Sequence, residues 1–124
     1  MELTIESLGT EEIGSAIPSA PHVLNRPVDL VHLTRYTMSD RTIEREVLSL
    51  FRTQSQALLR RLLSCPDQAS RRRTAHTLRQ SARSIGAWRV ALAAERADST
   101  QGREKLSRRI DEADAFIAAL LDRS

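Results

Sequence analysis

A histidine and several arginines share one predicted helix, and these residue types suit phosphate chemistry. Apolar residues recur there with a 3,4,3 spacing that places them on one side of an α-helix, facing the interior; they are Ala75, Leu78, Ala82 and Ile85. At about 100° per residue, His76 lies well over a right angle from the centre of this stripe. We therefore expect its imidazole to reach water.

Basic side chains surround the histidine on this helix. Three arginines fall within roughly 60° of it by the same geometry, and a further arginine and a glutamine flank its other edge; these residues are Arg72, Arg79, Arg83, Arg73 and Gln80. Guanidinium groups stay charged at any ordinary pH and bind phosphate through paired hydrogen bonds. The arginines therefore favour an anion held on or beside the ring, and a neutral imidazole can act as a nucleophile towards it.

The segment 76–86 resembles the signature of histidine phosphotransfer (Hpt) domains, roughly H-x-L-K-G-[SA]-[SA]-x-x-[IL]-G. The matching positions are His76, Leu78, the base at Arg79, Ser81, Ala82, Ile85 and Gly86. Residues 87–98 continue as that family does, and the resemblance covers about residues 28 to 122. It implies that His76 takes a phosphoryl group from a receiver-domain aspartate, or from a kinase histidine in the reverse sense, and passes it on.

Two positions depart from the signature. Arg79 replaces the family's lysine, which keeps the positive charge but changes a point donor into a planar fork. Gln80 replaces a glycine whose missing side chain lets the receiver's active site come close. The larger side chain either hinders docking or hydrogen-bonds the imidazole through its amide, and both outcomes stay open.

If the chain is a phosphocarrier, the residues near the histidine have expected roles. Beside His76, they are Arg79 and Arg83 for neutralising the phosphate, Arg72 and Arg73 for attracting the receiver, Ser81 and Ala82 as small residues that allow close approach, and Glu95 or Asp98 on the next helix for orienting the imidazole. Neutral imidazole would attack an aspartyl phosphate and form a phosphoramidate at Nε2.

The expected activity is that of a phosphocarrier and not of an enzyme. The chain has no glycine-rich nucleotide loop and is too short for an ATP-binding kinase domain beside a helical bundle. We expect no cofactor of its own, because any Mg²⁺ would come with the acidic cluster of the partner receiver. The expected partners are the receiver domain of a response regulator and a hybrid or other sensor histidine kinase.

Composition favours a single helical domain. The chain has 124 residues, 40% of them hydrophobic and only 3% aromatic, so small aliphatic side chains must fill the core. No apolar run approaches the roughly 18 residues that a membrane span needs, and no targeting segment is evident, so we expect a cytoplasmic protein. A single cysteine, Cys65, and the scattered histidines His22, His32 and His76 predict no metal site. His32 is interpreted as a packing or surface residue.

Charge is distributed unevenly along the chain. The net charge is +3 and the pI about 10.0, yet residues 1–25 contain four acids and no Lys or Arg, whereas residues 68–83 contain five arginines and no acid. A basic face attracts either nucleic acid or an acidic protein surface such as a receiver. The charge leaves a nucleic-acid-binding helical domain as one alternative. Gln80 leaves another, an Hpt-like adaptor that binds kinases or receivers without being phosphorylated.

Helix start and stop signals divide the chain. Residues 1–27 read as a mobile acidic arm, which either is inert or covers the arginines around His76. Asp29 is expected to cap a short helix over 30–36, and Ser39-Asp40 to begin a helix that ends near residue 64. Its predicted apolar stripe is Ile43, Val47, Leu50, Phe51, Leu58, Leu59, Leu62 and Leu63.

The remaining signals complete the predicted domain, residues 28–124. The His76 helix should run from Asp67 to Ile85 and end at Gly86, followed by helices over 88–94 and 106–121 with a turn at 99–102. Such helices pack most simply as an antiparallel up-and-down four-helix bundle, with the 30–36 helix as a short N-terminal cap. We expect this all-α domain to be a monomer with the His76 side facing outward.

Overall fold

The computed structural model describes residues 24–123 of the chain. Its regular elements in this range are all helices. They are α2 (Leu30–Tyr36), α3 (Arg41–Ser64), α4 (Gln68–Ile85), α5 (Trp88–Ala94) and α6 (Thr100–Arg123). The predicted all-α fold is confirmed.

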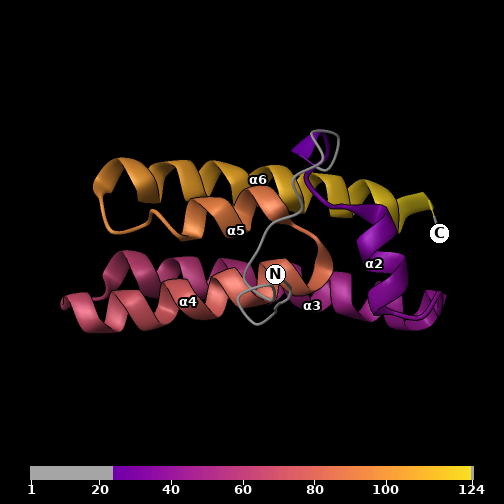
Figure 1. Ribbon diagram of the computed structural model, residues 1–124, viewed down its shortest axis with the longest axis horizontal. Coiled ribbons are helices and arrows are strands. Elements are labelled where there is room, and N and C mark those ends of the chain that lie inside the picture. The colour runs from indigo at the N-terminus through magenta and orange to yellow at the C-terminus, as the bar shows by residue number, and fades with distance from the viewer. Residues whose placement is uncertain (1–23, 124) are drawn as a thin grey trace, which may run out of the picture.

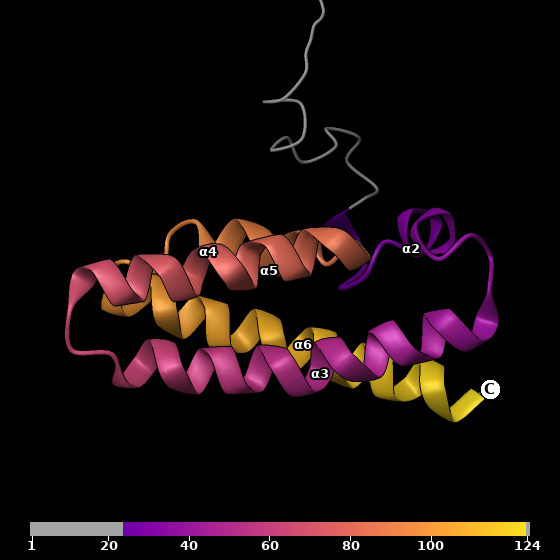
Figure 2. The same ribbon diagram turned by 90° about the horizontal axis from the view of Figure 1, so that it is seen from below.

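Helices α3 to α6 run alternately up and down the long axis of the molecule (Figure 1). Each packs against the next in the chain, and α6 returns to α3, which closes the four-helix bundle. The short α2 packs on α4 at one end of the bundle, as a second view shows (Figure 2). The predicted up-and-down bundle with a short N-terminal capping helix is therefore confirmed.

Three aspartates fix the starts of α2, α3 and α4. Asp29, Asp40 and Asp67 each accept a hydrogen bond from the backbone N–H three residues further on, at 3.2, 3.0 and 2.9 Å. Caps of this kind each stabilise a helix by about 1 kcal/mol. Gly86 ends α4 in the left-handed conformation at φ 82°, where a Cβ would lie 3.0 Å from Asp29.

The predicted stripe of α3 is wrong on its flanks. The buried residues of α3 are Leu48, Phe51, Ser55, Leu59 and Leu62. By contrast, Ile43, Leu50 and Leu63 are 40, 54 and 57% exposed. The reason is that α3 packs mainly on α4 and α6, so the buried strip is narrower than the run of apolar residues.

The core face of α4 also differs by one position from the prediction. Thr74 is buried and Ala75 is half-buried, whereas Leu78, Ala82 and Ile85 are buried as predicted. The Thr74 hydroxyl donates to the Ser70 carbonyl oxygen at 2.9 Å. This bond satisfies the hydroxyl and makes its burial compatible with the core.

Gly102 lies inside α6, so the predicted turn at 99–102 ends earlier than expected. Ser99 begins the helix, because its Oγ accepts from the Gly102 N–H at 2.9 Å and its carbonyl from the Arg103 N–H at 3.0 Å. A Cβ on Gly102 would lie 1.7 Å from the carbonyl oxygen of Arg96. Glycine is therefore needed for the close approach of two backbone segments and not for a turn.

The segment before α2 lies against α5. Arg89 Nε donates to the Leu24 carbonyl oxygen at 2.7 Å, and Val28 is fully buried. Most of the predicted 1–27 arm lies outside the described residues, so its mobility stays a prediction. Within residues 24–123, no helix is both long and apolar enough to cross a bilayer.

Candidate functional site

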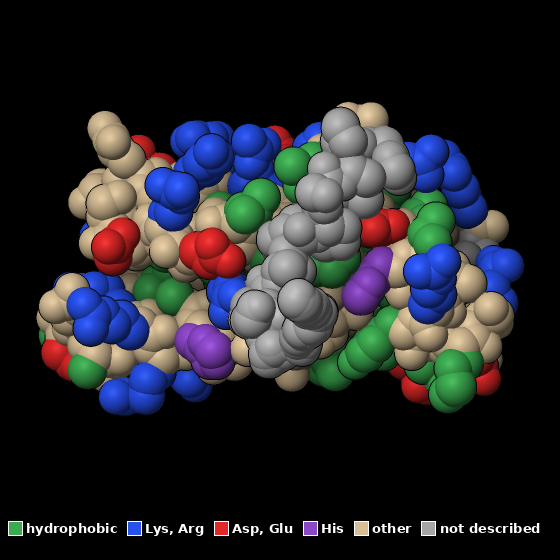
Figure 3. Space-filling model, in the orientation of Figure 1, with side chains coloured by type: hydrophobic (Ala, Val, Ile, Leu, Met, Phe, Trp, Pro, Cys, Tyr) green, Lys and Arg blue, Asp and Glu red, His purple; other side chains and the backbone are tan. Residues whose placement is uncertain are grey.

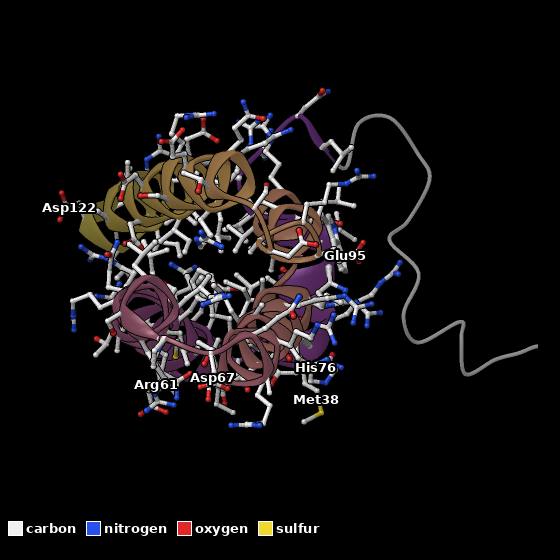
Figure 4. All side chains as sticks on the ribbon, turned by 90° about the vertical axis from the view of Figure 1, so that its left-hand side faces the viewer. Met38, Arg61, Asp67, His76, Glu95 and Asp122 are labelled. Atoms are coloured by element: carbon white, nitrogen blue, oxygen red, sulfur yellow. The ribbon has the colours of Figure 1, made fainter. Side chains whose placement is uncertain are left out.

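His76 is exposed on α4, at the edge of a groove between α4 and the end of α5. His76 and Glu95 lie on the same outer side of the bundle (Figure 4). The groove has a volume of about 200 Å³. It is lined by Gln68, Arg71, Arg72, Ala75, His76 and Arg79 of α4, and by Ala94, Glu95, Ala97 and Asp98.

Small side chains create the groove. Ala75 comes from α4, while Ala94 and Ala97 are each 4% exposed on the opposite side. Sequence reasoning assigned Ala75 to the core and gave Gln68, Ala94 and Ala97 no place in the site. For the residues of α4 the signal was present, because residues 68, 72, 75, 76 and 79 recur at the spacing of one helical face.

Arg79 and Glu95 join the two walls of the groove. Arg79 Nε lies 3.0 Å from Glu95 Oε2, with the two side chains 18 and 40% exposed. Glu95 was expected to orient the imidazole, but the contact that places it is this ion pair with Arg79. The half-buried Arg83 lies near both, and burial, together with the charge of Arg79, lowers the pKa of its guanidinium while Glu95 opposes the change.

The Gln80 side chain reaches back to the histidine. Its Nε2 lies 3.4 Å from Nε2 of His76. In the tautomer protonated at Nδ1, the amide N–H donates to Nε2, whose lone pair is then the acceptor. A bond of this length is weak, so the amide covers the nucleophilic nitrogen and can be displaced from it.

The arginines at the start of α4 differ in what they contact. Arg71 Nη1 donates to the carbonyl oxygens of Cys65 and Pro66, at 3.1 and 3.2 Å. Arg73 Nη2 donates to Ser70 Oγ at 3.0 Å and does not line the groove. Arg72 is exposed and lines the groove with His76. Basic side chains lie near a histidine over α4 on the molecular surface (Figure 3).

The remaining expected site residues occupy different depths. Ser81 is half-buried, and Ala82 is fully buried, so close approach at Ala82 is between helices of the bundle itself. Asp98 is exposed and lines the groove opposite α4. In the described part of the chain, no cluster of His, Cys, Asp and Glu side chains could hold a metal ion.

His32 belongs to the packing of α2, as interpreted from the sequence. Its Nε2 lies 3.0 Å from the Ser84 carbonyl oxygen. Its ring meets that of Trp88 edge-on, with centroids 4.9 Å apart. His32 therefore helps to fix α2 against the junction of α4 and α5.

One comparison with known proteins gives a match that spans the groove. The Hpt domain family model matches residues 46–123, more than half of the chain, and this range includes His76 and both walls of the groove. No curated protein and no solved structure gives a significant match. The chain therefore belongs to the Hpt domain family, whose members have a phosphotransfer role in two-component signalling.

Proposed function

We propose that His76 is the phosphoryl acceptor and donor of this Hpt domain. The observation that carries the proposal is the exposed imidazole at the edge of a basic groove, on the helix that the family match includes. An exposed histidine on a rigid helix can meet a partner's active site without unfolding any part of the bundle. Phosphoryl transfer depends mainly on positioning and charge neutralisation, and both are available here.

In the proposed step, the phosphoryl group moves from an aspartate of the partner to the imidazole of His76. The lone pair of Nε2 attacks the phosphorus of an aspartyl phosphate, so an N–P bond forms while the P–O bond to the aspartate breaks. The aspartate leaves as a carboxylate, and transfer to the next receiver reverses these changes. Gln80 must first release Nε2, which a weak 3.4 Å bond permits.

The surrounding charges have distinct proposed roles. Arg79 and Arg83 neutralise the phosphoryl oxygens, and Arg79 does so in competition with its partner Glu95. Arg72 and Arg73 attract the acidic receiver. Mg²⁺, where transfer needs it, comes with the receiver's carboxylates. This division gives α4 both the reacting atom and the charge that stabilises the transferred group.

The proposed partners are the receiver domain of a response regulator and a hybrid or other sensor histidine kinase. We propose that the chain serves them as a cytoplasmic monomer that carries the phosphoryl group without an active site of its own for ATP. An alternative is an adaptor that binds the same partners without being phosphorylated. The observation that favours the adaptor is the Gln80 amide beside Nε2 of His76.

The test is transfer of radiolabelled phosphate from a phosphorylated receiver to the parent chain and to His76→Gln. We expect acid-labile, base-stable label on the parent and none on the variant. His32→Gln is the matched control. Because His32 lies outside the groove, this variant should still be labelled at His76. Label that survives the loss of His76 would refute the site, and receiver binding without label on the parent would favour the adaptor.

A further inference from the structure

The side of α5 that faces away from His76 carries a second, more basic groove. It lies between α5 and α6 and has a volume of about 560 Å³. Its charged lining residues are Arg89, Arg96, Lys105 and Arg109, and none of its lining residues is acidic. Basic side chains gather over α5 and α6 on the surface (Figure 3). A groove of one charge raises the local concentration of anionic groups.

Two of these cations are paired with an acid in the described part of the chain, and two are not. Arg109 Nη1 lies 3.0 Å and Arg89 Nη1 3.7 Å from Oε1 of Glu112. Arg96 and Lys105 are exposed and form no ion pair with any residue between 24 and 123. The end of the groove near Arg96 and Lys105 is therefore the part that an acidic ligand would complement best.

The chain itself leads into this groove. Leu24 is one of its lining residues and is held by the 2.7 Å hydrogen bond from Arg89. The residues that precede Leu24 therefore start at the rim. They include four glutamates and no lysine or arginine; the acids are Glu2, Glu6, Glu11 and Glu12. The apolar residues Leu3, Ile5 and Leu8 lie among them in the sequence, and Leu92 in the groove is 38% exposed.

We infer that the acidic segment 2–12 of this chain docks in the basic groove between α5 and α6. The twelve-residue step from Glu12 to Leu24 spans up to about 40 Å, whereas the seven residues of α5 rise only about 10 Å. The segment can therefore reach Arg96 and Lys105. This inference does not depend on phosphorylation of His76.

The His76 groove is the less suitable acceptor for the same segment. Its Arg79 is paired with Glu95, and Arg71 is bonded to the end of α3. Glu95 and Asp98 also line that groove and would repel glutamates. Docking beside Arg96 and Lys105 leaves the His76 face open, so the segment should not slow the approach of a receiver.

Paramagnetic relaxation in the full chain tests this inference. A nitroxide is attached at Ser7→Cys in a Cys65→Ser background, and amide signals are compared before and after reduction of the label. We expect signal loss concentrated at amides of α5 and α6 near Arg96 and Lys105. The loss should largely disappear at about 1 M salt, where the Debye length falls to about 3 Å.

Charge reversal in the groove provides the matched comparison. Arg96→Glu with Lys105→Glu should abolish the localised loss, while Arg60→Glu with Arg61→Glu, two exposed arginines of α3, should leave it in place. Loss of amide signal centred on His76, or spread evenly over the bundle, would overturn the inference. So would loss on unlabelled molecules mixed with labelled ones, because the segment would then be docking on a second copy.

Discussion

Nε of Arg79 lies 3.0 Å from Oε2 of Glu95, and this ion pair links the base that follows His76 by three residues to the end of α5. A phosphoryl group on His76 would compete with the Glu95 carboxylate for the guanidinium. Ion pairs with this degree of exposure contribute about 0.2–1 kcal/mol. The balance between the two partners can therefore be changed by a single substitution.

Glu95→Gln should lengthen the lifetime of phosphohistidine. Without the competing carboxylate, Arg79 should bind the phosphoryl oxygens more strongly, and a gain of about 0.4–1 kcal/mol corresponds to roughly a two- to fivefold slower hydrolysis. Loss of acid-labile label from the isolated phosphoprotein measures this rate. Glu112→Gln is the control, because Glu112 pairs with Arg89 and Arg109 away from the groove. A shorter lifetime for Glu95→Gln would mean that Glu95 supports the imidazole.

Gln80→Ala should accelerate transfer from a phosphorylated receiver, by roughly the two- to fivefold expected from loss of one weak hydrogen bond of about 0.5–1 kcal/mol. The substitution uncovers Nε2 and gives the receiver more room. Single-turnover transfer kinetics provide the measurement. Gln80→Gly should transfer at least as fast, while losing about 1 kcal/mol of stability because glycine disfavours a helix interior. Slower transfer in both variants would assign Gln80 a positioning role.

Helix ends could be predicted because their causes are local. Asp29, Asp40 and Asp67 each bond a backbone N–H only three residues away, and Gly86 ends α4 through its own conformational freedom. These signals are complete within one turn of helix. The Hpt signature around His76 is equally local, which is why the family could be recognised from residues 76–86.

Contacts between helices could not be predicted in the same way. Whether Glu95 meets His76 or Arg79 depends on the rotation of α5 against α4, which no local pattern specifies. Gly102 looked like a turn residue, yet its role depends on the Arg96 carbonyl. Ala94 and Ala97 gave no chemical signal, although their small size creates the groove.

Asp29→Ala should destabilise the domain by about 2 kcal/mol. The carboxylate caps α2 through the His32 N–H and accepts from Trp88 Nε1 at 2.9 Å. The cap contributes about 1 kcal/mol, and the indole N–H would lose its partner. Urea unfolding, followed by the fluorescence of Trp88, measures the change. Thr34→Ala, which removes only an exposed hydroxyl on α2, should have a much smaller effect.

The same carboxylate should contribute to acid denaturation. Burial raises the pKa of Asp29, but hydrogen bonds from Trp88 and His32 outweigh it, so the pKa is lowered overall. A lowered folded-state pKa gives stability that is present above the unfolded value, about 3.9, and lost as pH falls through the folded value. Asp29→Asn should therefore lose less stability than the parent between pH 5 and 3. An equal loss of unfolding free energy in the parent and in Asp29→Asn over this pH range would contradict this assignment.

Asp114 should have the opposite pH dependence. Gln56 Nε2 donates to its Oδ2 at 2.6 Å, while Oδ1 is buried without a hydrogen-bond partner among the described residues. Burial raises the pKa of Asp114, although Gln56 and Arg52 act to lower it. A raised folded-state pKa means that the folded chain binds the proton more tightly. The charged carboxylate therefore costs stability at neutral pH, and this cost disappears as pH falls through the folded value towards the unfolded one.

Asp114→Asn should consequently raise the melting temperature at pH 7. The neutral amide keeps a hydrogen bond to Gln56 and avoids burying a charge. The gain should shrink as the pH is lowered towards about 4, because the parent then becomes protonated as well. Thermal unfolding across this range measures both effects, with Asp122→Asn as the control at an exposed carboxylate near the end of the same helix. A variant less stable than the parent at pH 7 would show that attraction to Arg52 outweighs the desolvation of Asp114.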